Sequence, residues 1–346
     1  MIKEQKHNEN QVRKYKEFLD TLYREVLLRP PDKEGLEHYI TSLVEKRMTL
    51  REVTESIIES DESKNIAYFS HYSAQFWNHL DEIKSYLNRL STGDENTNWM
   101  QDIPKRFKQY IPFHKVLVVG CGNGWVERTL FDLGIAKHFD AFDISEEYLT
   151  TAKEQKGNRP INYFISDINE MKNISNAEYD AVFNVAILHH AENIEYALKR
   201  LTEVLKPNGL MFNWEYVGPS RNQYSEEHVK RMQEIMESLP VKFRSTHSLR
   251  PPIENFRVEP TEAIHSDLIR PLFSKYFDII YERDLNGGIA YQILWNNIDE
   301  FKKGDKDAVE HLEFLINKDN EYTQLKKVPV LFWYSVGKPK NELHNK

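Results

Sequence analysis

The stretch Val116-Leu117-Val118-Val119-Gly120-Cys121-Gly122-Asn123-Gly124 decides the fold of this chain. Four consecutive apolar residues that end in glycines predict a strand buried on both faces, as in a parallel sheet. The glycines let the backbone turn tightly and approach a ligand without a Cβ clash. Helical sequence follows over residues 125–133. The segment therefore predicts a strand, a ligand-binding turn and a helix at the start of a doubly wound sheet.

Strand-like and helix-like segments alternate along the chain after this turn. Apolar runs predict further strands over Phe139–Asp143, Ile161–Ile165, Ala181–Val185 and Leu210–Trp214, with Phe277–Tyr281 and Val328–Val336 completing the sheet. Helical spacing over 148–155 and 194–205 separates several of these runs. Because such alternation implies right-handed βαβ units, we predict an α/β fold with a Rossmann-like, seven-stranded, mostly parallel sheet.

Helices are predicted before the first strand of this sheet and after its fifth strand. Apolar positions at helical spacing predict an all-helical N-terminal domain over residues 1–65, in which Asp32 caps the second helix. A helical lead-in over 66–110 precedes the α/β domain, which we place at 111–340. Residues 216–272 are too long for a simple crossover and predict a helical insertion after the fifth strand.

Composition excludes several classes of protein. The net charge of −8 over 346 residues argues against a protein that coats nucleic acid, because phosphate binding needs a positive face. No apolar run of about 18 residues predicts a membrane span, and the polar N-terminus lacks a signal peptide. The lone cysteine, Cys121, forms no intrachain disulfide and fits a cytoplasmic protein. No metal is predicted, since His189 and His190 are adjacent and match no known metal spacing.

The glycine turn and two acids predict which cofactor binds. A dinucleotide fingerprint needs a glycine where Trp125 stands, and an indole there would obstruct a pyrophosphate. S-adenosylmethionine (SAM) has no phosphate and tolerates this indole. Asp143 ends the second strand and can accept both ribose hydroxyls, while Asp167 follows the third strand and can accept from the adenine amino group. Ile144 and Ile168 can pack on the adenine faces. Taken singly, each acid could instead be a helix cap or a solvated loop residue.

Residues 111–215 resemble the class I SAM-dependent methyltransferases. The resemblance rests on Val119–Gly124, Asp143, Asp167, Tyr179–Asn184 and Leu205–Gly209. It implies methyl transfer with SAM as cofactor and S-adenosylhomocysteine as product, and it places Asn184 and Val185 beside the sulfonium. The segment Asn184–His190 departs from the N-P-P-Y pattern, which argues against an N-methyltransferase of that kind. The residues expected at the cofactor are Gly120, Cys121, Gly122, Asn123, Gly124, Asp143, Ile144, Asp167, Ile168, Asn184 and Val185.

Titratable residues at the ends of the fourth and fifth strands are the candidates for proton transfer. An alcohol acceptor usually needs a base during methyl transfer, whereas an amine or carboxylate does not. His189 and His190 follow the fourth strand, and Glu215 follows the fifth. These three are the candidate catalytic residues. Each has a structural alternative: a histidine can cap or underlie the next helix, and Glu215 can pair with Arg221.

Arginine, histidine and aromatic residues in and after the insertion are candidates for acceptor binding. Arg244 and Arg250 can hold an anionic group, although surface ion pairs explain such residues equally well. The residues expected to bind the acceptor are Tyr216, Arg221, Arg244, His247, Arg250 and Tyr291.

Two further resemblances concern the N-terminal half. Leu28–Tyr39 resembles a short helical domain of unknown function found in bacterial surface, secreted and glycan-assembly proteins, which implies a structural role and a possible docking site for another protein. Tyr86–Asp94 with Trp99 resembles the lead-in of methyltransferases from bacterial polysaccharide gene clusters, in which these helices cover the cofactor. This second resemblance implies a saccharide or glycan-related acceptor.

These observations leave several hypotheses open. The first is O-methylation of a saccharide, a glycan-related molecule or another polar small molecule. The second keeps SAM but changes the acceptor to a natural-product hydroxyl, amine or carboxylate. A third, of another class, is a module that binds SAM or docks to a protein without turnover. A nicotinamide-dependent dehydrogenase is the fourth, and Trp125 argues against it.

Overall fold

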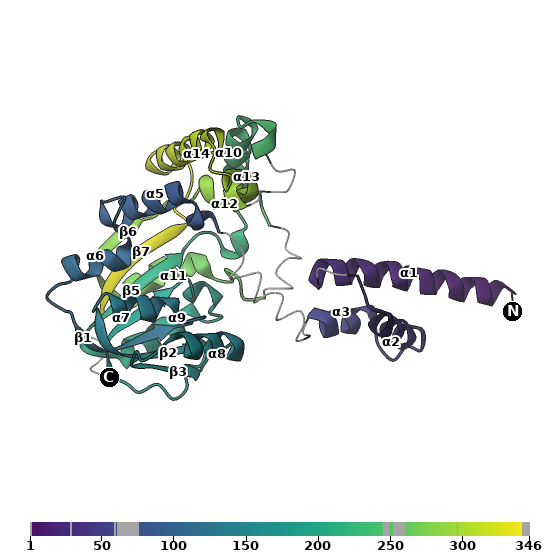
Figure 1. The fold of residues 1–346 in the computed structure, drawn as a ribbon, viewed down its shortest axis with the longest axis horizontal. Helices are drawn as coiled ribbons and strands as arrows, with labels where there is room; N and C mark the ends of the chain where they lie inside the picture. Colours follow the sequence, from purple (N-terminus) through teal and green to yellow (C-terminus); the bar gives the residue numbers. More distant parts are fainter. Residues whose placement is uncertain are drawn as a thin grey trace. The chain divides into compact units, whose positions relative to one another are not determined.

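The structure is a computed structural model that describes residues 2–27, 30–58, 60, 76–244, 249–251, 260–295 and 297–340. Contacts between residues divide the chain into two compact units, Met1–Gln75 and Phe76–Lys346. Figure 1 shows both units, each of which is described by itself below.

The first unit contains three helices, α1 (Ile2–Val26), α2 (Lys33–Val44) and α3 (Leu50–Ile58). The carboxylate of Asp32 accepts the Gly35 N–H at 2.8 Å, which confirms the predicted cap of the second helix. A Cβ at Gly35 would lie 2.4 Å from the Tyr23 hydroxyl, so only glycine lets α2 pack this closely on α1. The small core of this unit comes from all three helices, as the periodicity predicts.

A seven-stranded sheet forms the centre of the second unit (Figure 1). Its strand order is β3-β2-β1-β4-β5-β7-β6, and the first five strands in that order are parallel. β7 runs antiparallel to both β5 and β6. This topology confirms the predicted doubly wound, mostly parallel fold. The strands are β1 (Phe113–Val119), β2 (Ala136–Asp143), β3 (Ile161–Ile165), β4 (Tyr179–Val185), β5 (Leu205–Tyr216), β6 (Phe277–Asp284) and β7 (Phe332–Pro339).

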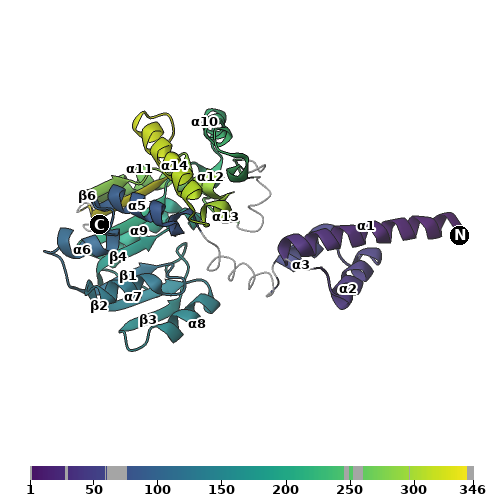
Figure 2. The same ribbon diagram turned by 45° about the horizontal axis from the view of Figure 1, so that its top comes forward.

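Helices cover both faces of the sheet (Figure 1, Figure 2). Successive side chains of β1 point to opposite faces, and each face has its own apolar core. Leu117 and Val119 lie in the core under α9 (Ile194–Val204) and α11 (Ile269–Tyr276). Val116 and Val118 lie in the core under α7 (Trp125–Asp132) and α8 (Glu146–Gln155). Burial on both sides explains why β1 reads as a continuous apolar run.

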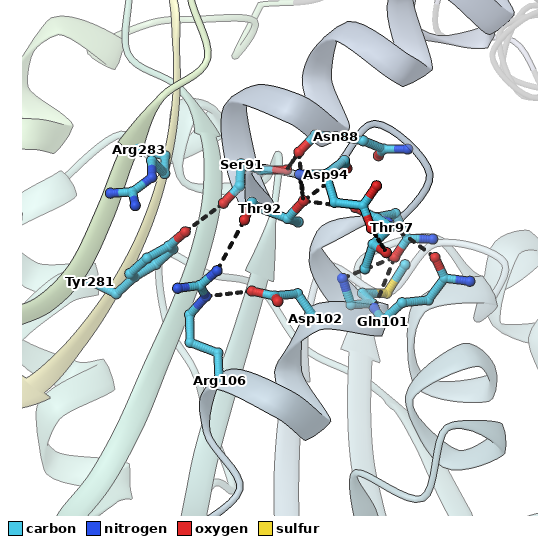
Figure 3. Close-up of polar contacts among 12 residues, drawn as sticks. Asn88, Ser91, Thr92, Asp94, Thr97, Gln101, Asp102, Arg106, Tyr281 and Arg283 are labelled. Atoms are coloured by element: carbon cyan, nitrogen blue, oxygen red, sulfur yellow. Dashed lines mark hydrogen bonds and ion pairs between the residues drawn. The ribbon is translucent and has the colours of Figure 1, made fainter.

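Two lead-in helices, α5 (Asp81–Thr92) and α6 (Trp99–Arg106), belong to this second unit. Figure 3 shows the polar network that holds them on β6. The Tyr281 hydroxyl donates to the Ser91 carbonyl at 2.6 Å, and Arg106 donates to the Thr92 carbonyl at 3.2 Å. The Arg106 guanidinium also pairs with Asp102 and lies 4.3 Å from the centre of the Tyr281 ring.

The lead-in helices also make apolar contacts with β5 and β7. Trp99 stacks on Trp214 of β5, with ring centres 5.7 Å apart, and contacts Tyr334 of β7. The predicted covering of the cofactor by these helices stays a prediction, because these contacts lie over β5 and β7 rather than at the glycine turn after β1.

Four helices gather at one end of the second unit in both views (Figure 1, Figure 2). They are α10 (Glu226–Glu237), α12 (Ala290–Trp295), α13 (Ile298–Phe301) and α14 (Lys306–Gln324). The sequence patterns discussed above did not single out α14. Its buried Asp319 accepts N–H groups of Gly287 and Ile289 at 2.9 and 2.7 Å and the Tyr86 hydroxyl at 3.0 Å. This carboxylate therefore joins the lead-in helices to the loop before α12.

Of the seven strands, β3 alone has the predicted bounds, and the largest differences are at the starts of β5 and β7. β5 begins at Leu205, before the predicted turn, because Leu205 pairs with Tyr179 and an irregularity in register takes up the intervening residues. β7 begins at Phe332 rather than at residue 328, because the Leu331 N–H donates to the Asn286 carbonyl in the preceding loop. Among the helices that the structure describes, none is both long and apolar enough to cross a membrane.

Candidate functional site

The glycine turn after β1 requires glycine at defined positions. Gly120, Gly122 and Gly124 have φ angles of 56°, 53° and 81°, in the left-handed region. A Cβ at Gly120 would lie 2.4 Å from the Ile187 side chain, and one at Gly124 would lie 2.4 Å from the Tyr163 hydroxyl. The turn therefore presents bare backbone at the carboxyl end of the sheet, where doubly wound folds bind ligands.

Gly120→Ala should unfold more easily than the wild type and bind SAM more weakly. A left-handed φ costs an alanine about 1–2 kcal/mol, and at this position the methyl group also displaces Ile187. Gly134→Ala is the matched control, since Gly134 has a φ of 69° but nothing within 4 Å of its Cβ position. Urea unfolding and calorimetric titration with SAM would measure both effects. Equal stability and equal SAM affinity of the two variants would contradict this role of the turn.

Asp143 lies at the end of β2 and is tied directly to the glycine turn. Its carboxylate accepts the Gly122 N–H at 2.8 Å and the Ser145 N–H at 2.9 Å. Asp143 is buried, with 7% of its surface exposed. The contacts fix the acid beside the turn, as binding of a ribose requires.

The remaining predicted cofactor residues lie in different surroundings. Ile144 is 71% exposed and offers apolar surface next to Asp143, whereas Ile168 is buried in the core. Asp167 accepts the Asn169 N–H at 2.8 Å and so begins a turn after β3. The buried side chain of Asn184 donates to Asn213 and to Glu215, so it is directed at β5 rather than at the glycine turn.

These residues fit SAM on structural grounds. The turn is a tight backbone cradle in which a Cβ at Gly120 or Gly124 would clash with the side chain of Ile187 or Tyr163, and it can accept a ligand whose methionine part runs along the backbone. Asp143 sits against this cradle, and Ile144 supplies an exposed apolar surface for an adenine ring. Trp125 is exposed at the first residue of α7, where a pyrophosphate would otherwise lie.

A buried carboxyl group lies under the cradle and was not anticipated from the sequence. Glu127 in α7 is buried, and neither of its carboxyl oxygens has a hydrogen bond of normal geometry in the described part of the chain. Burial raises the pKa of Glu127 to about 7. Its position under Gly124, next to the Tyr163 hydroxyl, makes it part of the support of the turn.

His189 and Glu215 form a buried pair at the carboxyl ends of β4 and β5. His189 lies in the short 3-10 helix η2 (Leu188–His190), and its Nδ1 is 2.5 Å from Oε1 of Glu215. Glu215 is 0% exposed and accepts five hydrogen bonds in all. The other four donors are Asn184 Nδ2 at 2.9 Å, Ile187 N at 3.0 Å, Leu188 N at 2.8 Å and Tyr216 N at 2.8 Å. The carboxylate of Glu215 is therefore saturated and orients His189.

Glu262 joins this pair from the insertion, and sequence reasoning missed it. Its Oε2 lies 3.6 Å from His189 Nε2 and 3.7 Å from His190 Nε2, and its side chain is 27% exposed. Burial works to lower the pKa of His189, but the charges and hydrogen bonds of Glu215 and Glu262 outweigh it and raise that pKa to about 10. No periodicity or strand end marks Glu262, so its only signal is its place in the predicted insertion.

Backbone contacts hold Glu262 against η2. The Ile264 N–H donates to the His189 carbonyl at 3.1 Å. Arg221 donates from its side chain to the Glu262 carbonyl at 3.1 Å and from its N–H to the Ala263 carbonyl at 2.7 Å. Arg221, predicted at the acceptor, thus positions the segment that carries Glu262 instead of pairing with Glu215.

The other predicted acceptor residues divide into two groups. Tyr216 lies near the histidines, with its ring 6.5 Å from that of His189, and Tyr291 lies 6.3 Å from Tyr216. Arg244 donates to the Leu239 carbonyl, while Arg250 donates to the Tyr224 carbonyl and pairs with Glu226. These two arginines support the region around α10. The predicted residue His247 lies outside the described residues.

The cofactor turn and the histidine cluster are neighbours. Ile187, whose side chain meets the Cβ position of Gly120, is two residues before His189 and donates its N–H to Glu215. A ligand on the glycine turn would therefore lie beside the cluster formed by His189, His190, Glu215 and Glu262, which we call the histidine–glutamate cluster.

Comparisons with known proteins identify two domains. Residues 117–213 match the methyltransferase domain family, and residues 4–67 match a domain of unknown function (DUF4214). The first match confirms the predicted SAM-dependent methyltransferase domain and SAM as its cofactor. The second agrees with the resemblance of the N-terminal segment.

Curated relatives match part of the chain. A ubiquinone biosynthesis O-methyltransferase of Rickettsia akari is 26% identical over 155 residues, which cover 44% of this chain and 59% of the relative. An uncharacterized methyltransferase of Mycobacterium bovis is 35% identical over 105 residues, which cover 30% of this chain and 52% of the relative. The alignments thus span little more than half the length of these relatives.

Among solved structures, the phosphoethanolamine N-methyltransferase 2 of Haemonchus contortus in complex with SAM is similar, with a TM-score of 0.45 and 15% identity. That similarity covers 79% of this chain and 60% of the other. The PH0226 protein of Pyrococcus horikoshii has a TM-score of 0.42 and 16% identity, with 78% of this chain and 99% of the other covered.

Proposed function

We propose that this chain, whose residues 117–213 form a SAM-dependent methyltransferase domain, transfers the methyl group of SAM to a hydroxyl of a saccharide or another polar small molecule. The observation that carries the proposal is the histidine–glutamate cluster beside the glycine turn. A hydroxyl is a weak nucleophile that has to lose its proton as it attacks, and this cluster supplies groups that can take a proton.

The reaction needs little covalent chemistry from the protein. SAM supplies a methyl group on a positively charged sulfur, and transfer is an in-line displacement. The new O–CH3 bond forms as the S–CH3 bond breaks, and the hydroxyl proton leaves. In our proposal the turn and Asp143 hold the cofactor, and the cluster lies on the side where the acceptor enters.

Each member of the cluster has a separate task in this proposal. Glu215 receives five hydrogen bonds and is completely buried, so it positions His189 rather than contacting the acceptor. The partly exposed Glu262 carboxylate, which lies 3.6 Å from His189 Nε2, takes the hydroxyl proton, and the positively charged His189 ring holds that carboxylate in place. His190, with its Nε2 directed at the same carboxylate, completes the site. The proton acceptor in this proposal is thus Glu262 rather than one of the histidines predicted from the sequence.

Three observations support the choice of acceptor. The Rickettsia relatives are O-methyltransferases by name, which favours oxygen as the accepting atom. The lead-in sequence with Trp99 resembles that of polysaccharide-cluster methyltransferases, and the N-terminal match is to a domain that we take as a docking module of glycan-associated proteins.

Incubation of the full chain with methyl-labelled SAM and a panel of acceptors would test the proposal. The panel includes nucleotide sugars, free saccharides, catechols, amines and carboxylates, and mass spectrometry identifies the product. We expect label on a saccharide hydroxyl, and a loss of at least ~100-fold in rate for Glu262→Gln with SAM affinity unchanged.

Different outcomes would overturn different parts of the proposal. Transfer to amines or carboxylates alone would replace the acceptor class. SAM binding without transfer to any acceptor would favour the docking module. Thermal stabilisation by NAD alone, and not by SAM, would end the methyltransferase assignment.

A further inference from the structure

We propose that His189, His190 and Glu262 bind one divalent transition-metal ion through His189 Nε2, His190 Nε2 and a Glu262 carboxylate oxygen. This inference rests on the proposed function, because the ion would hold the acceptor hydroxyl at the same cluster. It also differs from the prediction made from the sequence, in which no metal was expected because the two histidines are adjacent. The third ligand comes from a segment more than seventy residues further along the chain.

The distances between the donor atoms suit a single ion. One ligand atom from each of the three residues lies within 4.8 Å of the others. Glu262 Oε2 is 3.6 Å from His189 Nε2 and 3.7 Å from His190 Nε2. Ligands about 2.1 Å from one metal ion lie roughly 3.0–3.4 Å apart when they are neighbours in its coordination sphere. The two histidine–glutamate distances exceed this range by a few tenths of an ångström. The three ligand atoms, which lie within 4.8 Å of one another, would have to approach by up to about 1.4 Å to share one ion.

The second nitrogen of each ring has a partner of the kind that metal-binding histidines use. His189 Nδ1 lies 2.5 Å from the Glu215 carboxylate, and His190 Nδ1 lies 3.2 Å from the Thr261 hydroxyl. A carboxylate or hydroxyl on one ring nitrogen fixes the tautomer and turns the other nitrogen toward a metal. Here both Nε2 atoms are turned toward the same carboxylate oxygen, that of Glu262.

The ligands are carried on backbone that is held in place. Glu215 accepts the N–H groups of Ile187 and Leu188, which begin the turn of η2 that presents both histidines. The Ile264 N–H donates to the His189 carbonyl, so the segment with Glu262 is bonded directly to the segment with the histidines. Such support keeps three ligands close together at low cost in conformational entropy on binding.

The donor set indicates which ions bind and what they hold. Two imidazoles and one carboxylate suit Zn²⁺, Mn²⁺, Fe²⁺ or Co²⁺, whereas Mg²⁺ and Ca²⁺ prefer oxygen alone.

Three protein ligands leave neighbouring positions open on one side of the ion. Two adjacent oxygens of one molecule would fill them, so we infer an acceptor with a vicinal diol, either on a saccharide ring or on a catechol. When His189 and Glu262 hold the ion, the hydroxyl proton passes to solvent water instead of to Glu262, as the O–CH3 bond forms and the S–CH3 bond breaks.

Titration of the chelator-treated full chain with Co²⁺ would test the site directly, because protein-bound Co²⁺ has visible absorption bands that report its ligands. We expect one equivalent of Co²⁺ in the wild type, and at least 10-fold weaker binding in His190→Ala and in Glu262→Gln. His265→Ala is the matched control, since His265 lies three residues beyond Glu262 and outside the cluster. Glu262 is partly exposed, so the glutamine variant should fold, and thermal unfolding checks this.

The results separate the metal site from the proposed function. Absence of saturable Co²⁺, Mn²⁺ and Zn²⁺ binding, or equal binding by Glu262→Gln and the wild type, overturns the metal site even if methyl transfer occurs. Stoichiometric binding that Glu262→Gln loses and His265→Ala keeps supports it, even if no acceptor is methylated. If the chelator abolishes methyl transfer and added Mn²⁺ or Zn²⁺ restores it, the metal also takes part in catalysis. The identity of the methylated product, a saccharide or a catechol, then shows which molecule supplies the two oxygens.

Discussion

Asp143→Ala should bind SAM at least ~100-fold more weakly than the wild type. The alanine would remove the two charge-assisted hydrogen bonds that we expect Asp143 to accept from the ribose, and each such bond is worth about 1.5–3 kcal/mol. It also leaves the Gly122 N–H without the acceptor that now lies 2.8 Å away, so the turn loses part of its support. Isothermal titration with SAM and with S-adenosylhomocysteine would measure the loss.

Asp140→Ala is the matched control for this variant. Asp140 lies on the same strand, β2, but pairs with Lys115 at 2.8 Å and accepts the Tyr179 hydroxyl at 2.7 Å, away from the glycine turn. Its removal should lower stability and leave SAM affinity within about 2-fold of the wild type. If Asp143→Ala bound SAM as tightly as Asp140→Ala does, the ribose assignment would be wrong.

Glu215→Ala should lower the free energy of unfolding by about 3–5 kcal/mol and abolish methyl transfer. Its removal leaves four hydrogen-bond donors and the His189 imidazole without their common acceptor in a buried place. Since His189 then loses the contact that sets its orientation, transfer should fall at least ~100-fold even at temperatures where the variant is folded. Urea unfolding and the transfer assay would measure the two effects separately.

Asp319→Ala is the matched control, because it shows how much transfer is lost when a buried carboxylate is removed away from the histidine–glutamate cluster. Asp319 is also a fully buried carboxylate that accepts several backbone N–H groups, but it lies in α14 and does not contact the histidine–glutamate cluster. Both variants should lose stability to a similar extent, and only Glu215→Ala should lose transfer in the folded protein. Equal residual transfer in the two folded variants would show that Glu215 acts on stability alone.

Features that depend on neighbouring residues could be predicted from the sequence. The turn after β1 follows from an apolar run that ends in glycines, and the structure gives these glycines the left-handed φ angles that the interpretation requires. Asp143 lies at the end of β2 and contacts this turn, because parallel strands bring their carboxyl ends to one edge of the sheet. The helix cap at Asp32 was predictable for the same reason, since a cap involves residues only three positions apart.

Features that depend on distant parts of the chain could not be predicted. Asn184 lies one residue before the end of β4, and its side chain bonds to Asn213 and Glu215, because the register between β4 and β5 places Asn184 opposite Asn213. Register between strands is set by packing over the whole sheet and is not visible in a single strand. The long helix α14 was missed although its buried Asp319 holds the loop at Gly287.

Sequence patterns were sufficient to predict the class of fold, the cofactor turn and the acids at the strand ends, because apolar periodicity and glycine turns are properties of short stretches of chain. The side chains that meet at the carboxyl ends of β4 and β5 could be identified only from the folded structure. It saturates Glu215 with five donors, turns both histidines toward Glu262 and takes Glu262 from an insertion that no local pattern marks. The physical reason is that such contacts depend on how the insertion packs against η2, which is decided by side chains far apart in the sequence.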